Sequence, residues 1–79
     1  MARYFIRWVD VAEDAYYKLP PKQQKAVDKR MDQIAENPRD GSSYDKSTDR
    51  WTTTADNGTI MIVFALHNET LRITILRLF

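Results

Sequence analysis

The sequence predicts an α+β protein in which two N-terminal helices pack on one face of a four-stranded, largely antiparallel sheet. Three features carry this prediction. Apolar residues recur at helical spacing between residues 10 and 36, whereas β-rich segments occupy residues 3–9 and 51–79. Prolines and glycines separate these segments, and the resulting order is β-α-α-β-β-β. The length of 79 residues is that of a single domain, spanning residues 1–79.

The first strand and helix are predicted from residues 3–19. Residues 3–9 (RYFIRWV) are rich in aromatic and β-branched types, which is typical of a strand. Alternation along this strand puts Tyr4, Ile6 and Trp8 on one face and Phe5, Arg7 and Val9 on the other. Asp10 is a suitable N-cap for a helix that continues to Leu19, where the Pro20-Pro21 pair ends it.

A second helix is predicted from Pro21 to Glu36. Its apolar stripe consists of Val27, Met31, Ile34 and Ala35, and its charged residues lie around the opposite side. Asn37-Pro38 ends the helix, because the residue before a proline is disfavoured in the α region. Residues 39–49 are polar and contain Gly41, so they are predicted to form a loop.

Three strands are predicted after this loop. Residues 51–55 lead into Asp56-Asn57-Gly58, a strong hairpin signal, and the apolar residues 59–66 are expected to form a central strand covered on both faces. His67-Asn68-Glu69 is then predicted to turn the chain into a last strand over residues 70–79. Simple alternation along that strand divides its residues between two faces: Leu71, Ile73, Ile75 and Arg77 on one, and Arg72, Thr74, Leu76 and Leu78 on the other.

Composition limits the chemistry and the location. The chain has no cysteine and one histidine, which excludes a disulfide or a Cys-based metal site, and no cofactor is expected. No apolar segment has the length of a signal sequence or a membrane span, so a cytoplasmic protein without membrane contact is expected. The net charge is only +1, but five basic residues and one acid lie between Lys18 and Arg30. This local excess is the main charge feature of the sequence.

The order of these elements, with these residues, resembles the RelE/ParE superfamily of toxins from bacterial type II toxin–antitoxin modules. The resemblance covers essentially the whole chain. It rests on the following features: Tyr4-x-Ile6-x-Trp8, then Ala12, Tyr16 and Leu19, then Pro21 with Gln23 or Gln24, Asn37-Pro38-Arg39 after the second helix, Trp51 at the start of a strand, and a glycine hairpin before the apolar strand that contains Phe64.

The resemblance implies a toxin that inhibits growth and is neutralised by a cognate antitoxin. Ribosome-dependent cleavage of mRNA, as in RelE-like proteins, is the favoured interpretation, with the ribosome and mRNA as partners. Inhibition of DNA gyrase, as in ParE-like proteins, is an alternative. A degenerate member that binds antitoxin without harming the cell is another, and a homodimer in the absence of antitoxin is compatible with each of them.

In ribosome-dependent members a basic surface docks on RNA, and this resemblance assigns Lys22, Lys25 and Lys29 to such a phosphate-contacting row. The alternative is an ordinary solvated helix face. Arg72 on the last strand is a further candidate for RNA contact.

Metal-free RNA cleavage by 2′-hydroxyl attack requires a base, an acid and cations that stabilise the phosphorane. Arg77 matches an arginine common in RelE-like proteins. Arg50, Lys46 and Tyr44 lie just before the second predicted strand, and Arg72 and Arg77 lie on the last strand. If these two strands are neighbours in the sheet, Arg50 and Arg77 flank one concave site, and Tyr44 enters it from the loop. The alternatives are a strand-end cation for Arg77, polar loop residues for Arg50 and Lys46, and a loop anchor for Tyr44.

Other family positions depart from the pattern. The residues that stand where basic side chains are usual are Thr52, Thr54, Ile60 and Met61, and only Leu78 and Phe79 follow Arg77. A metal-independent endoribonuclease activity is therefore left open. His67 is expected to lie in a turn, away from the site.

The aromatic residues Trp8, Trp51 and Phe64 fit core positions, with base stacking as the alternative. The apolar C-terminal residues 76–79 are expected to pack against an antitoxin segment.

Overall fold

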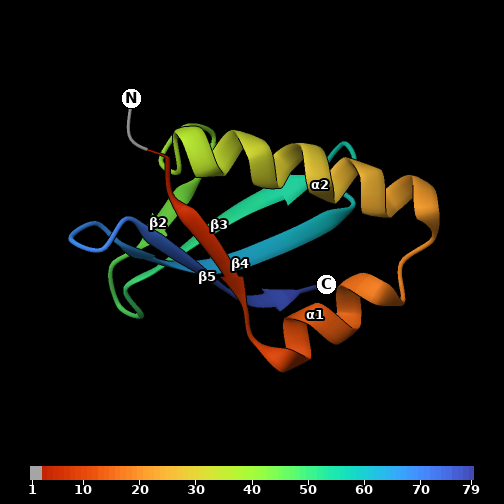
Figure 1. Cartoon of the computed structure of the whole chain (residues 1–79), viewed down its shortest axis with the longest axis horizontal. Coiled ribbons are helices and arrows are strands. Elements are labelled where there is room, and N and C mark those ends of the chain that lie inside the picture. Colours follow the sequence, from red (N-terminus) through yellow and green to blue (C-terminus); the bar gives the residue numbers. More distant parts are fainter. Residues whose placement is uncertain (1–2) are drawn as a thin grey trace.

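The computed structural model describes residues 3–79, so the first two residues of the predicted domain lie outside it. It contains one five-stranded sheet with two helices on one face (Figure 1). The elements are β1 (Phe5–Trp8), α1 (Asp10–Tyr17), α2 (Pro21–Glu36), β2 (Ser43–Asp45), β3 (Arg50–Ala55), β4 (Ile60–His67) and β5 (Arg72–Leu78). Two helices on one face of an α+β sheet are confirmed, whereas the predicted number of four strands is wrong.

The spatial order of the strands is β1-β5-β4-β3-β2. β1 pairs in parallel with β5, and the other neighbours are antiparallel, so the sheet is mixed. After β1 the chain passes through α1 and α2 to β2 at the far edge of the sheet. The strands β3, β4 and β5 then return across the sheet, so the last strand lies beside the first (Figure 1).

β2 lies in the segment predicted as a loop. Ser43, Tyr44 and Asp45 pair with the start of β3, although all three are exposed. The backbone amide and hydroxyl of Ser47 donate to Asp45 Oδ1 at 3.0 and 2.7 Å and fix the turn between the two strands. Since pairing to β3 uses the backbone alone, β2 has no apolar pattern that the sequence could have revealed.

The predicted helix ends need small corrections. The N-cap of α1 is Val9, and Asp10 is already helical, where it and Glu13 place negative charge in the first turn. α1 ends at Tyr17 rather than at Leu19. The bounds of α2 are as predicted, with Pro21 in its first turn.

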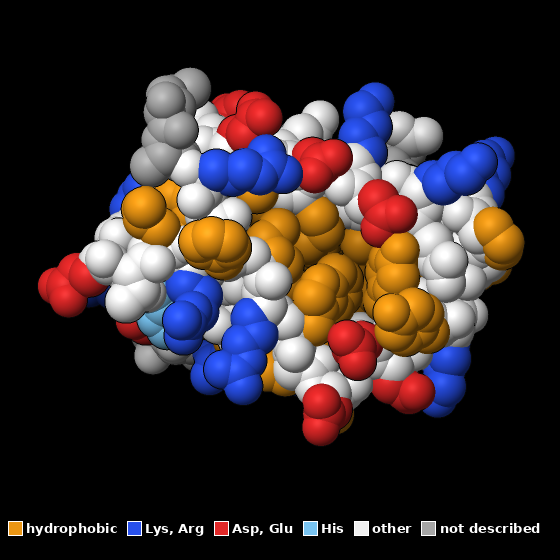
Figure 2. All heavy atoms as spheres, viewed as in Figure 1, with side chains coloured by type: hydrophobic (Ala, Val, Ile, Leu, Met, Phe, Trp, Pro, Cys, Tyr) orange, Lys and Arg blue, Asp and Glu red, His pale blue; other side chains and the backbone are white. Residues whose placement is uncertain are grey.

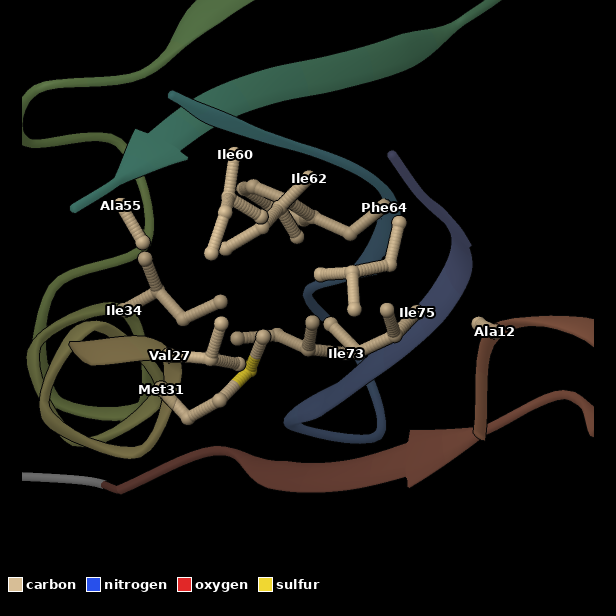
Figure 3. Close-up of a cluster of buried hydrophobic side chains, with 11 residues drawn as sticks. Ala12, Val27, Met31, Ile34, Ala55, Ile60, Ile62, Phe64, Ile73 and Ile75 are labelled. Carbon is tan, nitrogen blue, oxygen red and sulfur yellow. The ribbon is translucent and has the colours of Figure 1, made fainter. Parts of the chain in front are cut away.

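The core lies between the helices and the sheet (Figure 3). The stripe of α2 is buried as predicted, and Val27, Met31 and Ile34 face the side chains of β4 and β5. Phe64, Ile62, Ile73 and Ile75 are fully buried, and they are the centre of this cluster. Phe64 is therefore a core residue, which excludes it from base stacking.

The central strand β4 is covered on one face only. Ile60, Ile62 and Phe64 are buried, but Met61 between them is 39% exposed and Val63 is half-buried. The prediction of burial on both faces is wrong, because both helices lie on the same side of the sheet and the apolar residues of the other side remain accessible.

A β-bulge changes the predicted faces of β5. Val63 of β4 pairs with Arg77, whereas the next residue, Phe64, pairs with Ile75, which leaves Leu76 without a direct partner. The extra residue reverses the alternation, so Leu78 enters the core and Arg77 is exposed. Arg77 thus lies on the face opposite to Ile73 and Ile75, contrary to the prediction from simple alternation.

A hydrogen-bonded cluster around Arg30 joins α2 to the loop before β2. Arg30 Nε and Nη2 donate to the buried Thr53 Oγ1 at 2.9 and 2.6 Å, and Nη2 also donates to the Gly41 carbonyl at 3.0 Å. Gly41 has a φ of +70°, which favours glycine. Arg30 therefore holds the loop against the sheet.

Replacing Arg30 by Met is expected to lower the free energy of unfolding by about 1–2 kcal/mol, because it removes charged donors from a partly buried cluster. Urea denaturation measures the change. Lys29→Met is the matched control, since Lys29 is exposed and neighbours Arg30. Equal losses in the two variants would contradict a role for the cluster in stability.

Tyr16 links the two helices. Its hydroxyl donates to Asp28 Oδ1 at 2.6 Å, and this hydrogen bond, more than burial, raises the pKa of Tyr16 to about 12. The folded state therefore holds this proton more tightly than the unfolded chain, in which the pKa of tyrosine is near 10.

The stabilising effect of this hydrogen bond is expected to be complete below pH 10 and to be lost as the pH rises towards 12. Urea midpoints of the wild type and Tyr16→Phe, measured from pH 8 to 11.5, test this expectation. The difference between the two proteins should shrink above pH 10. A difference that stays constant across this range would argue against the shifted pKa.

Candidate nucleic-acid interface

The face of the sheet opposite the helices carries four arginines: Arg7, Arg50, Arg72 and Arg77. We call this surface the arginine face. Arg7 pairs with Thr74, Arg72 with Phe5 and His67, and Arg77 with Val63, so these residues share one side of neighbouring strands. Arg50 alternates with the inward-facing Trp51, which places Arg50 on the same side.

Arg50 and Arg77 line one hollow of about 470 Å3 on the arginine face, together with Asp45, Thr48, Thr52, Val63, Leu76 and Phe79. The prediction that these two arginines flank a common concave site agrees with this placement. They come from β3 and β5, on either side of β4. Arg77 reaches the hollow only because of the bulge at Leu76.

The arginines of this face have no carboxylate partner within residues 3–79. Elsewhere in the described chain the arginines are engaged: Arg3 pairs with Asp32 and Glu36 at 3.0 and 3.3 Å, and Arg39 donates to Asn68 at 2.9 Å. The guanidinium of Arg77 instead lies 5.6 Å from the centre of the Phe79 ring. These exposed cations are available for anions, and phosphate matches the geometry of a guanidinium.

Asp45 is the acid at the edge of the hollow. The Ser47 hydroxyl, and secondly the Ser47 amide, donate to its carboxylate and hold the pKa of Asp45 below its usual value. Asp45 is therefore a turn-stabilising carboxylate that stays ionised, which makes it a poor proton donor.

Tyr44 does not enter the hollow. Its ring packs on Trp51 with centroids 5.0 Å apart, and its hydroxyl donates to Asp49 Oδ1 at 2.7 Å. This hydrogen bond raises the pKa of Tyr44, so the group stays protonated. Since Trp51 in turn stacks on the buried Phe64, Tyr44 lies on the helix side of the sheet, and the predicted entry from the loop is wrong.

The lysines lie in other places. Lys46 is in the turn after β2, next to the hollow, but does not line it. Lys22, Lys25 and Lys29 are exposed on α2, and α2 covers the face of the sheet opposite to the arginine face. The structure therefore separates the predicted lysine row from Arg50, Arg72 and Arg77.

Two residues of the arginine face were misplaced or overlooked from sequence. His67 is the last residue of β4, in register with Arg72, and is not in a turn. Arg7 shares the face with Phe5, as alternation along β1 predicts, but its partners depend on the parallel pairing of β1 with β5.

Phe5 and Phe79 are exposed aromatic residues of the arginine face, and their side chains are 78% and 64% accessible. Trp8 and Trp51 instead pack against the core.

Comparison with solved structures identifies the fold. The chain superposes on a chain of the toxin–antitoxin complex RelBE2 from Mycobacterium tuberculosis with a TM-score of 0.82 and 22% identity, covering 96% of this chain and 95% of that one. The isolated RelE toxin of E. coli gives a TM-score of 0.82 at 16% identity, covering 95% of this chain and 81% of RelE.

The archaeal RelE–RelB complex from Pyrococcus horikoshii OT3 gives a TM-score of 0.73 at 17% identity, covering 99% of this chain and 93% of the matched one. No protein-family model and no curated protein matches the sequence. The chain therefore has the fold of RelE toxins. Within the described residues, neither helix is long and apolar enough to cross a membrane.

Proposed function

We propose that this chain is the toxin of a type II toxin–antitoxin module, acting in the cytoplasm on mRNA at the ribosome and neutralised by a cognate antitoxin. The observation that carries the proposal is the arginine face: four cations without a carboxylate partner in residues 3–79, on the uncovered side of a RelE-like sheet. Similar structures are RelE toxins, some of them in complex with antitoxins.

In this proposal Arg50 and Arg77 hold a phosphate of single-stranded RNA in the hollow between them. Cleavage proceeds by attack of the 2′-hydroxyl on phosphorus, which forms a 2′,3′-cyclic phosphate and breaks the bond to the 5′-oxygen. Water accepts the hydroxyl proton and supplies one to the leaving oxygen. The two guanidinium groups stabilise the negative charge that accumulates on the phosphorane. Arg7 and Arg72 contact neighbouring phosphates, and the exposed Phe79 offers a surface on which a base can stack.

The experiment is controlled expression of the chain in a bacterial host, followed by primer extension on abundant transcripts. Growth arrest with mRNA cut within codons is expected, and co-expression of the cognate antitoxin should restore growth. Arrested growth with intact mRNA would eliminate the nuclease function. Unaffected growth, with the folded protein present, would indicate a degenerate relative.

A second candidate is a toxin that binds its target without cleaving RNA, such as a gyrase inhibitor. The position of Tyr44 favours it, because this residue, predicted to enter the site, lies on the helix side of the sheet and its hydroxyl donates a hydrogen bond to Asp49. A supercoiling assay with purified gyrase distinguishes the two. Inhibition is expected only for this second function, and an unchanged supercoiling rate at saturating protein would exclude it.

A further inference from the structure

Three exposed residues form one cross-strand set at the end of the arginine face that is distant from the hollow. Arg72 of β5 pairs with Phe5 of β1 on one side and with His67 of β4 on the other. Side chains of directly paired residues lie on the same face of a sheet, so the three are neighbours on the arginine face. We call Phe5, Arg72 and His67 the edge triplet. Figure 2 shows basic side chains beside the histidine at this end of the sheet.

The edge triplet is not engaged by other side chains of the described chain. Within residues 3–79, none of the ion pairs includes Arg72 or His67, and none of the aromatic or cation–π contacts includes Phe5. The Phe5 side chain is 78% exposed, more than any other large hydrophobic side chain in these residues. The edge triplet therefore presents a free aromatic ring beside a free guanidinium.

The charges around the edge triplet favour an anion. Arg7 lies on the same face two residues after Phe5, in the diagonal position to Arg72. The acid nearest to His67 along the chain is Glu69, which belongs to the turn between β4 and β5. Two guanidinium groups thus outnumber the one carboxylate of that turn.

The edge triplet and the hollow are separate places on the arginine face. Val63 lines the hollow, and His67 lies four residues further along the same strand, β4. This separation corresponds to about 13 Å at about 3.3 Å per residue. A stacked single strand advances by about 3.4 Å per nucleotide, so about four nucleotides cover the distance. A nucleotide bound in the hollow therefore does not reach the edge triplet.

From these features we infer that the edge triplet is a second nucleotide-binding subsite, which takes an unstacked base about four nucleotides away from the phosphate in the hollow. This inference rests on the proposed function. The base stacks on Phe5, Arg72 binds the adjoining phosphate, and His67 offers a second ring to the base. Aromatic rings, histidine included, and guanidinium planes are the surfaces on which proteins stack splayed-out bases.

The second subsite defines the class of substrate. Two subsites about four nucleotides apart require a single strand of at least about five nucleotides. A duplex is excluded, because its bases are not free to stack on Phe5. Stacking accepts every base, since each has a π-face, so the edge triplet adds affinity with little sequence preference.

The test measures binding of two RNAs to the full chain by NMR titration. One is an oligonucleotide of eight 2′-O-methyluridines, which offers no 2′-hydroxyl for cleavage, and the other is the corresponding dinucleotide, whose single phosphate fills the hollow alone. Phe5→Leu is expected to weaken binding of the longer RNA about ten-fold, because the stacked ring is lost. Phe5→Trp restores a ring and should bind this RNA within about two-fold of the wild type.

A control and a second position complete the design. Tyr17→Leu removes a comparably exposed ring, 69% accessible, from α1 on the other side of the sheet, and should change the affinity less than about two-fold. His67→Ala is expected to weaken binding of the longer RNA at least about three-fold. Binding of the dinucleotide should be the same for the wild type, Phe5→Leu and His67→Ala, since it does not extend beyond the hollow.

The remaining outcomes separate the inference from the proposed function. Unchanged binding of the longer RNA by Phe5→Leu and His67→Ala would overturn the second subsite and leave the proposed function intact. Equal losses with the longer RNA and the dinucleotide would also overturn it, because the two residues would then act on the hollow. If neither RNA binds the wild-type chain, RNA binding by the arginine face fails, and the inference fails with it.

Discussion

An R50E/R77E double variant is expected to bind single-stranded RNA about 100-fold more weakly than the wild type and to lose toxicity. Charge-assisted hydrogen bonds contribute about 1.5–3 kcal/mol each, and loss of two contacts at the lower end of this range corresponds to about 100-fold. Both side chains are exposed and line the same hollow, so the change leaves the core intact. Fluorescence anisotropy with a labelled oligonucleotide and growth on induction measure the two effects.

The control for this prediction is K22E/K25E, which changes the net charge by the same amount on the exposed surface of α2. Its RNA affinity is expected to fall less than about three-fold, through the long-range charge alone. Similar losses in both double variants would show that RNA responds to net charge rather than to the arginine face. Undiminished toxicity of R50E/R77E would remove the arginine face from the proposed function.

Replacing Phe64 by Ala is expected to remove a large part of the free energy of unfolding and to lower the urea midpoint strongly. Phe64 is fully buried at the centre of the core and stacks on Trp51. Loss of a buried phenylalanine costs about 3–5 kcal/mol. The whole stability of a protein of this length is only about 4–12 kcal/mol, and no disulfide supplements it. Circular dichroism and urea denaturation provide the measurement.

Phe64→Leu and Phe79→Ala are the controls for this prediction. Phe64→Leu keeps most of the apolar volume and should cost less than about 2 kcal/mol. Phe79→Ala removes the same ring from an exposed position, and it should leave stability almost unchanged. A folded Phe64→Ala protein with a urea midpoint close to that of the wild type would contradict the assignment of Phe64 to the core.

Local sequence signals predicted the helices and the long strands well. α2 is framed by prolines and carries a clear apolar stripe, and the hairpin after β3 has positive φ angles at Asp56, Asn57 and Gly58, as its sequence predicts. β2 gave no signal, because it is short, exposed and held by backbone pairing to β3. The overestimated burial of β4 has a related cause, since an apolar run does not reveal which layers surround it.

The candidate site was predictable in part. Arg50 and Arg77 were predicted to share a site, and they line one hollow, but simple alternation put Arg77 on the wrong face of the sheet. Tyr44 has the right residue type for proton transfer but is turned to the other side by its packing on Trp51. Arg7 and His67 joined the arginine face only once strand neighbours were known.

The sequence by itself determined the two helices and the strands β1, β3, β4 and β5, because these depend on neighbours along the chain: proline positions, turn residues and apolar spacing. β2 is the exception, since only its pairing with β3 makes it a strand. Only the tertiary structure decided which charges share a surface. One unopposed residue, Leu76, reverses the faces of β5, and the parallel pairing of β1 with β5 brings Arg7 beside residues more than sixty positions away. Strand pairing and register depend on contacts distant in sequence, and they place the four arginines on one side and the lysines of α2 on the other.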